Sequence, residues 1–326
     1  MKYFIIILLV FQQSFAQAQE RYDRTFKLMG SRFDITVIAS NESDGRIYID
    51  LAISEISRIE KLISSWDPNS QTSEINKNAG ILPVKVDREL FNLIERSNKI
   101  SKLTSGAFDI TYAGMDKIWE FDGSITQMPD LEAIQISVKK VGYENIILDK
   151  KNSTIFLKKS GIKIGFGAIG KGYAADQAKK LLQSKGVLGG IINASGDMNT
   201  WGKQPDGKPW LAGITNPLNK EKVFSWLPIE DQAIVTSGNY EKFILLDGIR
   251  YSHIIDPRTG MPSNGITSVT VLTKQAELAD ALATSLFVMG VEVALDFTNQ
   301  LNGVECVIID NNNKVHTSKN INLNKI

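Results

Sequence analysis

The sequence predicts an α+β fold in a single domain of mixed sheet and helices. Segments with strand periodicity and segments with helix periodicity follow one another without regular alternation, which does not favour a doubly wound sheet. Of the 326 residues, 43% are apolar, enough to bury a full core. No repeat, low-complexity tract or long linker divides the chain. We therefore expect one domain over residues 19–326, preceded by a leader over residues 1–18.

The first 18 residues predict a secretory signal peptide. Met1-Lys2 gives a basic start, residues 3–11 are apolar, and Ala16-Gln17-Ala18 supplies the small residues of a cleavage site. The apolar run is shorter than the roughly 20 residues of a membrane-spanning helix. We expect cleavage after Ala18 and an exported, periplasmic protein. No cysteine follows the run to accept a lipid anchor.

The composition argues against some classes of partner. The chain carries 37 basic and 36 acidic residues, a formal net charge of +1, without a basic stripe or an acidic tail. Nucleic acid is therefore not expected as a partner. The one cysteine, Cys306, has no second cysteine with which to form an internal disulfide. It lies in the apolar run 304–309, so we expect an inert thiol in a buried strand.

Local patterns predict the elements of the first half of the chain. A Met29-Gly30 turn is followed by alternating apolar and polar residues, and two later segments carry apolar residues at helical spacing. Asp87 is a good N-cap for the second of these helices. The elements expected are a strand at 33–38, a helix from Ile47 that ends before Trp66, a helix after Asp87, and a hairpin over 145–157.

The second half mixes short strands, turns and helices. A helix is expected from beyond Lys171 to about Ser184, and two more are expected near the C-terminus. The strands expected are 190–193, 211–215, 233–236, 243–246, 250–255, 266–272 and 304–309, and the two further helices are 277–289 and 291–299. This order again favours an α+β fold.

Within the helix predicted at 277–289, Asp280 and Thr284 lie four residues apart and therefore on one face. A carboxylate and a hydroxyl are hard oxygen donors, and the residues between them are small or apolar. Such a sparse oxygen site suits a magnesium ion whose coordination a substrate phosphate completes. Glu277 could add another oxygen or act only as a charge at the helix N-terminus. The alternative is that the pair is a coincidence of the helix surface.

A glycine-rich turn over residues 165–176 leads into the helix that starts near Lys171. Glycines let backbone amides approach a phosphate, and a helix N-terminus adds a favourable partial charge. Lys171 could contact a pyrophosphate there as a mobile charge. The spacing matches neither a Walker loop nor a dinucleotide fingerprint. The alternative is a tight strand-to-helix turn with a lysine that faces solvent.

Histidine occurs twice, at His253 and His316, and His316 lies in a polar C-terminal stretch. His253 is predicted on a strand that ends in an Asp-Pro turn, where an imidazole could take a proton from an attacking hydroxyl. A structural histidine is the alternative. Arg258, just beyond the turn, could contact phosphate or pair with Asp256.

Three further turns carry polar residues. In 105–111, a glycine turn precedes Asp109, which could accept hydrogen bonds from a nucleobase or ribose or could belong to an ordinary cap. The clusters 193–197 and 236–240 could approach the same ligand or serve only as turns. None of these three signals is specific by itself.

Taken together and in order, seven segments resemble the FAD:protein FMN transferase (ApbE) family. They extend over nearly all of residues 19–326 and are Met29-Gly30-Ser31, Ser64-Ser65-Trp66, Gly106–Asp109, Gly170–Asp176, Thr236-Ser237-Gly238, His253–Pro257 and Ala279–Thr284. The resemblance implies a T-fold-like α+β architecture and a magnesium-dependent enzyme with FAD as substrate. Members transfer the FMN half to a threonine, or sometimes serine, hydroxyl of an acceptor flavoprotein and release AMP. Acceptors of this kind are electron-transfer proteins at the membrane.

Carried over residue by residue, the resemblance implies three groups of site residues. The magnesium ligands are the side chains of Asp280 and Thr284 and the carbonyl of Ala168. The residues that hold the flavin nucleotide are Met29, Trp66, Ala107, Phe108, Asp109, Lys171 and Ile255. His253 is the candidate base, and Asp280 contributes to catalysis through the metal.

Two residues depart from the pattern of the family. Gly165 stands where aspartate is common, so one polar contact to FAD is missing or is supplied elsewhere. Trp66 stands where tyrosine is common, and it offers a stacking ring with an indole N–H in place of a hydroxyl. The metal pair is kept, so we expect an active enzyme.

Two other functions remain open from the residues alone. With water in place of the acceptor, the same site would be an FAD pyrophosphatase that yields FMN and AMP. A protein that binds FAD without turnover would be a non-enzymatic, exported FAD-binding protein. Release of AMP without an acceptor would indicate the first, and FAD unchanged after incubation with magnesium would indicate the second.

Overall fold

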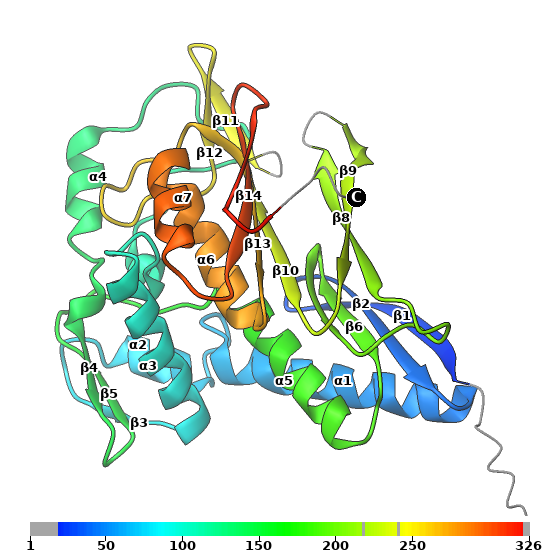
Figure 1. Cartoon of the computed structure of the whole chain (residues 1–326). Helices are drawn as coiled ribbons and strands as arrows, with labels where there is room; N and C mark the ends of the chain where they lie inside the picture. The colour runs from blue at the N-terminus through cyan, green and yellow to red at the C-terminus, as the bar shows by residue number, and fades with distance from the viewer. Residues whose placement is uncertain (1–18, 217–218, 240–241, 322–326) are drawn as a thin grey trace, which may run out of the picture.

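The computed structural model describes residues 19–216, 219–239 and 242–321. Their centre is an antiparallel sheet of eight strands in the order β1-β2-β6-β7-β10-β13-β14-β15 (Figure 1). The strands are β1 (Glu20–Leu28), β2 (Ser31–Ala39), β6 (Gly190–Ala194), β7 (Asp197–Trp201), β10 (Ala233–Gly238), β13 (Ile266–Thr273), β14 (Glu305–Asp310) and β15 (Val315–Thr317). Met29 and Gly30 join β1 to β2 with φ of 49° and 72°, the left-handed pair that suits a two-residue hairpin turn.

Four helices pack against the sheet, each on neighbouring strands (Figure 1). These helices are α1 (Glu42–Ile63), α5 (Gly170–Ser184), α6 (Ala276–Met289) and α7 (Val291–Asn299). Helix α1 contacts β1 and β2, α5 contacts β6 and β7, α6 contacts β10 and β13, and α7 contacts β14. Because α5 also contacts both α1 and α6, it is the central helix of this layer.

The segment between α1 and α5 adds helices and a three-stranded sheet in the order β3-β5-β4, at the left of Figure 1. Its elements are α2 (Gln71–Lys77), β3 (Val84–Lys85), α3 (Arg88–Leu103), the 3-10 turn η1 (Ile110–Gly114), α4 (Leu131–Val138), the 3-10 turn η2 (Tyr143–Asn145), β4 (Ile146–Asp149) and β5 (Thr154–Leu157). Two hairpins follow β7. They are β8 (Trp210–Asn216) with β9 (Asn219–Ile229), and β11 (Phe243–Leu246) with β12 (Ile249–Ser252).

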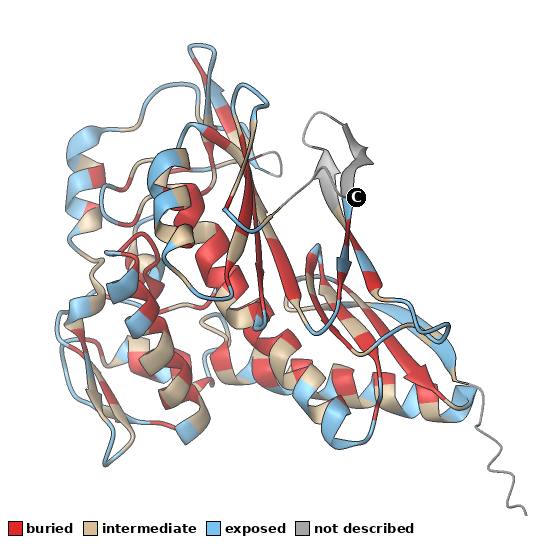
Figure 2. Cartoon of the chain, in the orientation of Figure 1, coloured by how far each residue is buried: buried red, intermediate tan, exposed pale blue. Residues whose placement is uncertain are grey.

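The alternation of β2 divides the core between the two faces of the sheet. Phe33, Ile35 and Val37 are fully buried in the core on the helix side. Ile38 points the other way and packs in a smaller cluster with residues of the β8–β9 hairpin. In Figure 2, buried residues follow α5, α6 and the inner strands of the sheet. The helix layer therefore encloses the larger of these two cores.

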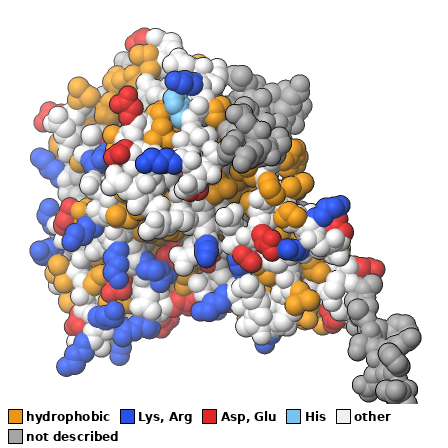
Figure 3. All heavy atoms as spheres, viewed as in Figure 1, with side chains coloured by type: hydrophobic (Ala, Val, Ile, Leu, Met, Phe, Trp, Pro, Cys, Tyr) orange, Lys and Arg blue, Asp and Glu red, His pale blue; other side chains and the backbone are white. Residues whose placement is uncertain are grey.

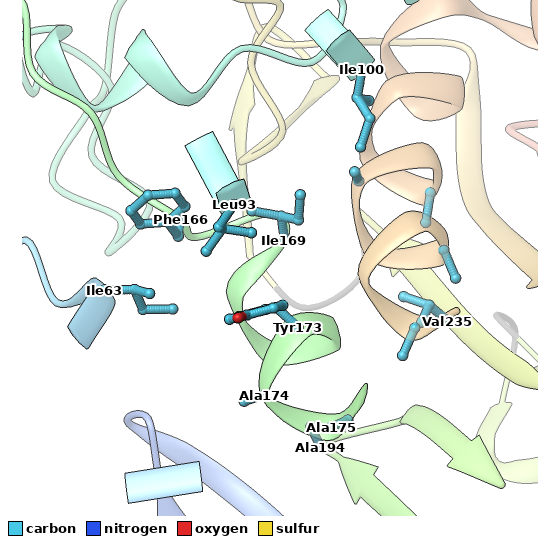
Figure 4. Packing of buried hydrophobic residues seen from close by; sticks show 14 of the residues in the cluster. Ile63, Leu93, Ile100, Phe166, Ile169, Tyr173, Ala174, Ala175, Ala194 and Val235 are labelled. Atoms are coloured by element: carbon cyan, nitrogen blue, oxygen red, sulfur yellow. The ribbon is translucent and has the colours of Figure 1, made fainter. Parts of the chain in front are cut away.

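The start of α5 is fixed by residues from three other segments. Figure 4 shows Ile63 from the end of α1, Leu93 from α3 and Phe166 from the preceding turn around Ile169 and Tyr173. All five side chains are at most 6% exposed. Burial of this extent holds the N-terminus of α5 in one place.

The predicted helices correspond to α1, α3, α5, α6 and α7, and the predicted hairpin corresponds to β4 and β5. Cys306 is buried in β14, as expected. Asp87 stands at the N-cap position of α3, but its side chain makes no capping bond to that helix. It accepts a hydrogen bond from Gln71 Nε2 instead, which ties the start of α3 to α2.

Two strand predictions are wrong at their ends. Strand β12 ends at Ser252, so His253 lies beyond the strand on which it was predicted. The reason is the pairing: β11 begins at Phe243, which stands opposite Ser252, and the ladder stops there. The strand predicted at 304–309 runs from Glu305 to Asp310, and β15, which pairs with it, was not predicted.

The sequence patterns did not predict α2, α4, β7, β9 or β15, which are short or interrupted. Strand β9 contains Pro228, which lacks an N–H but is tolerated because β9 lies at the edge of a two-stranded sheet. Helix α2 has only 7 residues and begins after Ser70, whose hydroxyl accepts the Ser73 amide at 3.0 Å. Such elements depend on local bonds rather than on a repeating apolar pattern.

None of the helices within the described residues is long and apolar enough to cross a bilayer. The signal peptide predicted at residues 1–18 lies outside the described part of the chain. On the face drawn in Figure 3, basic and acidic side chains are interspersed with hydrophobic ones.

Gly190 in β6 gives a test of the packing in the sheet. A Cβ there would lie 2.4 Å from Trp201 Cη2 and 2.5 Å from the Thr36 carbonyl oxygen. We expect Gly190→Ala to lower the free energy of unfolding by about 1–3 kcal/mol, as overpacking does. Urea denaturation measures the change. Gly167→Ala is the control, because a Cβ at Gly167 meets nothing within 4 Å. Equal stability of the two variants would contradict the packing argument.

Candidate functional site

Three elements bring charged side chains together beside the sheet. Lys171, in the first turn of α5, forms an ion pair with Asp197, the first residue of β7. Asp280 of α6 lies close enough to both for their charges to interact. Asp197 and Asp280 are only 4% and 5% exposed, whereas the Lys171 side chain is 30% exposed. The cluster therefore has two buried carboxylates and one ammonium group that solvent can still reach.

Helices α5 and α6 cross at Gly172. Its amide donates to Asp280 Oδ2 at 3.0 Å. A Cβ on Gly172 would lie 2.1 Å from the Ala276 carbonyl oxygen, so no side chain fits between the helices. Ile169, at the N-cap position of α5, has no side-chain acceptor for the first amides of the helix. Asp280, which lies on α6, supplies that acceptor instead.

Burial shifts the pKa values of the three side chains in this cluster. Removal from water, reinforced by Asp197, raises the pKa of Asp280 to about 7 although Lys171 and the Gly172 amide oppose the change. Burial also raises the pKa of Asp197, against the effect of Lys171. For Lys171, burial lowers the pKa, but Asp197 and Asp280 outweigh it and the pKa rises. With both carboxylates ionised, the cluster has one negative charge in excess, which a bound cation would offset.

The structure places the predicted metal pair one turn apart on α6. Thr284 Oγ1 lies 3.4 Å from Ser237 Oγ at the end of β10. Nowhere in residues 19–216, 219–239 or 242–321 do three His, Cys, Asp or Glu side chains form a metal-binding group. A site at Asp280 would therefore use few side chains, as magnesium does when waters and phosphates complete its shell. The oxygen donors and the excess negative charge fit a divalent cation.

The turn before α5 leads directly into Lys171 and has an open side. A Cβ on Gly167 would meet nothing within 4 Å. Ala168, whose carbonyl is the third predicted metal ligand, follows in the same turn, which the Gly170 amide closes by donating to the Phe166 carbonyl at 2.7 Å. Met29 also reaches this turn, because its Cε lies 3.7 Å from the position of a Cβ on Gly170.

The two departures from the family pattern lie close together. A Cβ on Gly165 would lie 2.9 Å from Ala113 Cβ and 3.6 Å from Ser65 Oγ, so an aspartate at position 165 does not fit without movement. Trp66, next to Ser65, is 83% exposed, and Lys117 Nζ lies 5.5 Å from the centre of its ring. The indole ring is therefore open to a stacking partner.

Residues Ala107, Phe108 and Asp109 are buried. Ala107 is fully buried and Phe108 belongs to the main core, so neither residue presents an open surface, and their contact with FAD stays a prediction. Asp109 Oδ1 accepts from the amide and hydroxyl of Thr111 at 2.8 and 2.6 Å, and Oδ2 accepts from the Tyr143 amide at 2.8 Å. Asp109 thus holds η1 to η2. Its contact with FAD stays a prediction.

His253 is half-buried next to the end of β12. Its Nδ1 lies 3.1 Å from the Lys242 carbonyl oxygen, and its ring packs edge-on against Phe121 with 6.3 Å between ring centroids. A carbonyl can only accept a hydrogen bond, so this contact places the ring proton on Nδ1. The role of His253 as a base stays a prediction.

Ile255 and Arg258 lie in the loop that follows His253. Ile255 is 8% exposed and packs in a small apolar cluster around Trp119. Arg258 pairs with Asp256 at 2.8 Å, the second of the two alternatives expected from the sequence. Arg258 Cγ lies 3.4 Å from the position of a Cβ on Gly106, so the loop adjoins the turn that contains Asp109.

Apart from Trp66, which lies beside Lys117, the predicted residues fall into two groups. One surrounds the N-terminus of α5 and contains Met29, Ala168, Lys171, Asp280 and Thr284. The other joins the loop after β12 to the turn before η1 and contains Ala107, Phe108, Asp109, His253 and Ile255. Asp197 was expected only as part of a turn cluster, and its ion pair with Lys171, 26 residues away, could not be predicted from local patterns.

A cavity of about 770 Å³ lies away from this cluster, between α3, α5 and the start of α6. Its lining includes Arg96 and Glu277, which form an ion pair at 2.6 Å, and Glu89, which accepts from the Tyr173 hydroxyl at 2.8 Å. Glu277 is therefore paired with an arginine. Asp280 is absent from the lining, so we do not assign this cavity to FAD.

Comparison with known proteins identifies the family of this chain. Residues 29–308 match the ApbE family. A FAD:protein FMN transferase of Klebsiella pneumoniae (strain 342) is 30% identical over 296 residues, which are 90% of this chain and 90% of that protein. The protein of the same name from Escherichia coli (strain K12) is 31% identical over 241 residues, which are 72% and 69% of the two chains.

Solved structures show the same fold. The ApbE protein from Thermotoga maritima superposes with a TM-score of 0.83 at 33% identity, over 92% of this chain and 97% of that one. The flavin transferase ApbE from Vibrio cholerae gives a TM-score of 0.80 at 27% identity, over 92% and 98%. The predicted single-domain α+β fold is confirmed. With sequence and structure matched over most of its length, the chain belongs to the ApbE family.

Proposed function

We propose that this protein transfers FMN from FAD to a threonine, or serine, hydroxyl of an acceptor flavoprotein, with magnesium as the metal and AMP as the second product. Family membership supports this, as do relatives at about 30% identity that are named for the activity. The observation that carries the proposal is the cluster of Lys171, Asp197 and Asp280 beside an open glycine turn at a helix N-terminus.

This cluster suits a substrate with a pyrophosphate. Lys171 supplies a full positive charge, and the N-terminus of α5 favours anions. Asp197 already holds the lysine side chain in place, so less conformational freedom is lost when a phosphate binds. The substrate phosphate and Asp197 then both contact the Lys171 ammonium group, whose position is set before the substrate binds.

Asp280, Thr284 and the Ala168 carbonyl would hold the magnesium ion. When bound, the ion supplies positive charge that stabilises the pyrophosphate and the departing AMP. The Gly172 amide, bonded to Asp280 Oδ2, fixes the orientation of the carboxylate, as outer partners of metal ligands do.

The reaction is a substitution at phosphorus. The acceptor hydroxyl attacks the FMN-side phosphorus of FAD, a new P–O bond forms to the acceptor, and the bond to the bridging oxygen breaks. AMP leaves with that oxygen, and no group is oxidised or reduced. His253 is the candidate base for the hydroxyl proton. FMN remains joined to the acceptor by a phosphodiester.

We place the reaction in the periplasm, after export. The pattern of residues 1–18 supports export. The acceptor we propose is a membrane-associated electron-transfer flavoprotein with its target hydroxyl on the same side of the membrane. This part of the proposal rests on the sequence and on the family resemblance.

Mass spectrometry of a threonine-bearing acceptor domain from the same organism tests the activity. We expect incubation with the protein, FAD and magnesium to add the mass of one FMN, and EDTA to prevent the addition. AMP that accumulates while the acceptor stays unmodified would replace the proposal with an FAD pyrophosphatase. FAD that remains intact would leave a non-enzymatic FAD-binding protein.

Asp280→Ala is expected to lower the rate of FMN transfer by about a hundredfold or more, the usual effect of losing one charge-stabilising group. Asp280→Asn should also be slow, yet it keeps an acceptor for the Gly172 amide and removes a buried charge. Its melting temperature should equal or exceed that of the wild type. Normal transfer by a folded Asp280→Ala protein at ordinary magnesium concentrations would refute the metal assignment.

Magnesium binding should depend on pH because the ion must displace a proton from Asp280, whose pKa is raised to about 7. Below pH 7 the protonated fraction grows, so we expect the affinity to fall by about tenfold for each pH unit. Above pH 7 the carboxyl is ionised and the affinity should level off. Calorimetric titration of metal-free protein with magnesium between pH 5.5 and 8.5 measures this. An affinity that is constant below pH 7 would contradict the prediction.

A further inference from the structure

We propose that Asp176 is a positioning residue that holds the first turn of α6 against α5 and thereby sets the place of Asp280 and Thr284. The role in the metal site rests on the proposed function above. The contact between the two helices does not, and it can be measured without metal or substrate.

Asp176 caps a helix to which it does not belong. It lies on α5, but its Oδ1 accepts the Ala276 amide at 2.9 Å and its Oδ2 accepts the Glu277 amide at 2.9 Å. These are the first two residues of α6. Gln275, at the N-cap position of α6, makes no side-chain capping bond. The unsatisfied amides at the start of α6 therefore find their acceptor on α5.

The arrangement is reciprocal. Asp280 of α6 accepts the Gly172 amide in the first turn of α5, where the N-cap residue again lacks a side-chain acceptor. Each helix thus offers a first-turn amide and, four residues later, an aspartate on the same face: Gly172 and Asp176 on α5, Ala276 and Asp280 on α6. Two aspartates join the N-termini of two crossing helices.

Strand β7 fixes the carboxylate of Asp176. Asn199, fully buried in β7, donates from Nδ2 to Asp176 Oδ1 at 2.6 Å and accepts from Lys179 Nζ at 3.1 Å. Asn199 stands two residues after Asp197, so both side chains leave β7 on the same face. One strand therefore holds Lys171 through Asp197 and Asp176 through Asn199.

The consequence for the metal pair follows from helix geometry. The Asp280 amide belongs to the turn that bonds back to the Ala276 carbonyl, so fraying of the first turn releases the backbone of Asp280. Thr284 is one turn further along the same face. An ordinary cap would stabilise its helix with no effect on a ligand, whereas this cap lies one turn before Asp280 and two turns before Thr284, the two predicted side-chain ligands.

A carboxylate is needed at this position because all three partners donate. The amides of Ala276 and Glu277 and the Asn199 Nδ2 require acceptors, and Asp176 supplies two oxygens. Asparagine has the same shape but only one oxygen, and its NH₂ group would face a donor. Asp176→Asn is therefore a mild variant that removes at least one of the two capping bonds without creating a cavity.

The matched control is Asn41→Ala. Asn41 accepts the Asp44 amide at 3.0 Å and caps α1. Helix α1 has 22 residues, so this cap lies about 33 Å along the helix from the end that reaches the start of α5. Loss of the Asn41 cap should weaken a helix to a similar degree without touching the α5–α6 crossing.

The first measurement is hydrogen–deuterium exchange by NMR on metal-free protein. In Asp176→Asn, the amides of Gly172, Ala276 and Glu277 should exchange at least about tenfold faster than in the wild type, while the Asp44 amide is unchanged. In Asn41→Ala, only the Asp44 amide of these four should exchange faster than in the wild type. An unchanged rate for Gly172 in Asp176→Asn would overturn the proposal, because the two caps would then be independent.

The second measurement is the magnesium concentration that gives half-maximal FMN transfer. We expect an increase of about tenfold in Asp176→Asn, the lower end of the effect of removing outer partners of metal ligands, with little change in the rate at saturating magnesium. Asn41→Ala should leave it unchanged. The same increase in both variants would make Asp176 a stabilising cap only. Wild-type transfer that needs no magnesium would refute the proposed metal site, and the exchange rates would still decide the role of Asp176.

Discussion

The site depends on how closely α5 and α6 approach each other at Gly172. A side chain at this residue would overlap the Ala276 carbonyl, so the crossing is possible because glycine leaves the space empty. At this distance a main-chain amide of α5 bonds to the Asp280 carboxylate of α6. Since α5 is also packed against α1 and the sheet, a contact at one residue determines where the acidic groups of α6 lie.

The two carboxylates of the cluster are kept apart from water, and when both are ionised their charge exceeds that of Lys171. Lys171 faces two buried carboxylates, and burial together with their mutual repulsion raises the pKa of Asp280. A pair made only for stability would match charges one to one, because an uncompensated buried charge is costly. The excess fits a site that becomes balanced when a cation binds. Asp197 meanwhile keeps Lys171 in place for the phosphates that would accompany such an ion.

The sequence could predict the parts of this arrangement that depend on near neighbours. Helical spacing placed Asp280 and Thr284 on one face, and the glycine turn placed Lys171 at a helix start. Spacing could not predict that Asp176 caps α6, because the bonded amides lie 100 and 101 residues further along the chain. The position of His253 beyond β12 likewise depends on where the partner strand begins. The packing of the whole fold sets which distant segments pair, and a local sequence pattern cannot predict these pairings.

The two residues that depart from the expected family pattern, Gly165 and Trp66, lie close together. Gly165 adjoins Ala113 and Ser65, so an aspartate at position 165 fits only if its neighbours move. Trp66, beside Ser65, presents a larger ring than tyrosine and is 83% exposed. The cluster on α5, β7 and α6 uses none of these residues, so the contacts of Lys171, Asp197 and Asp280 do not depend on positions 66 and 165.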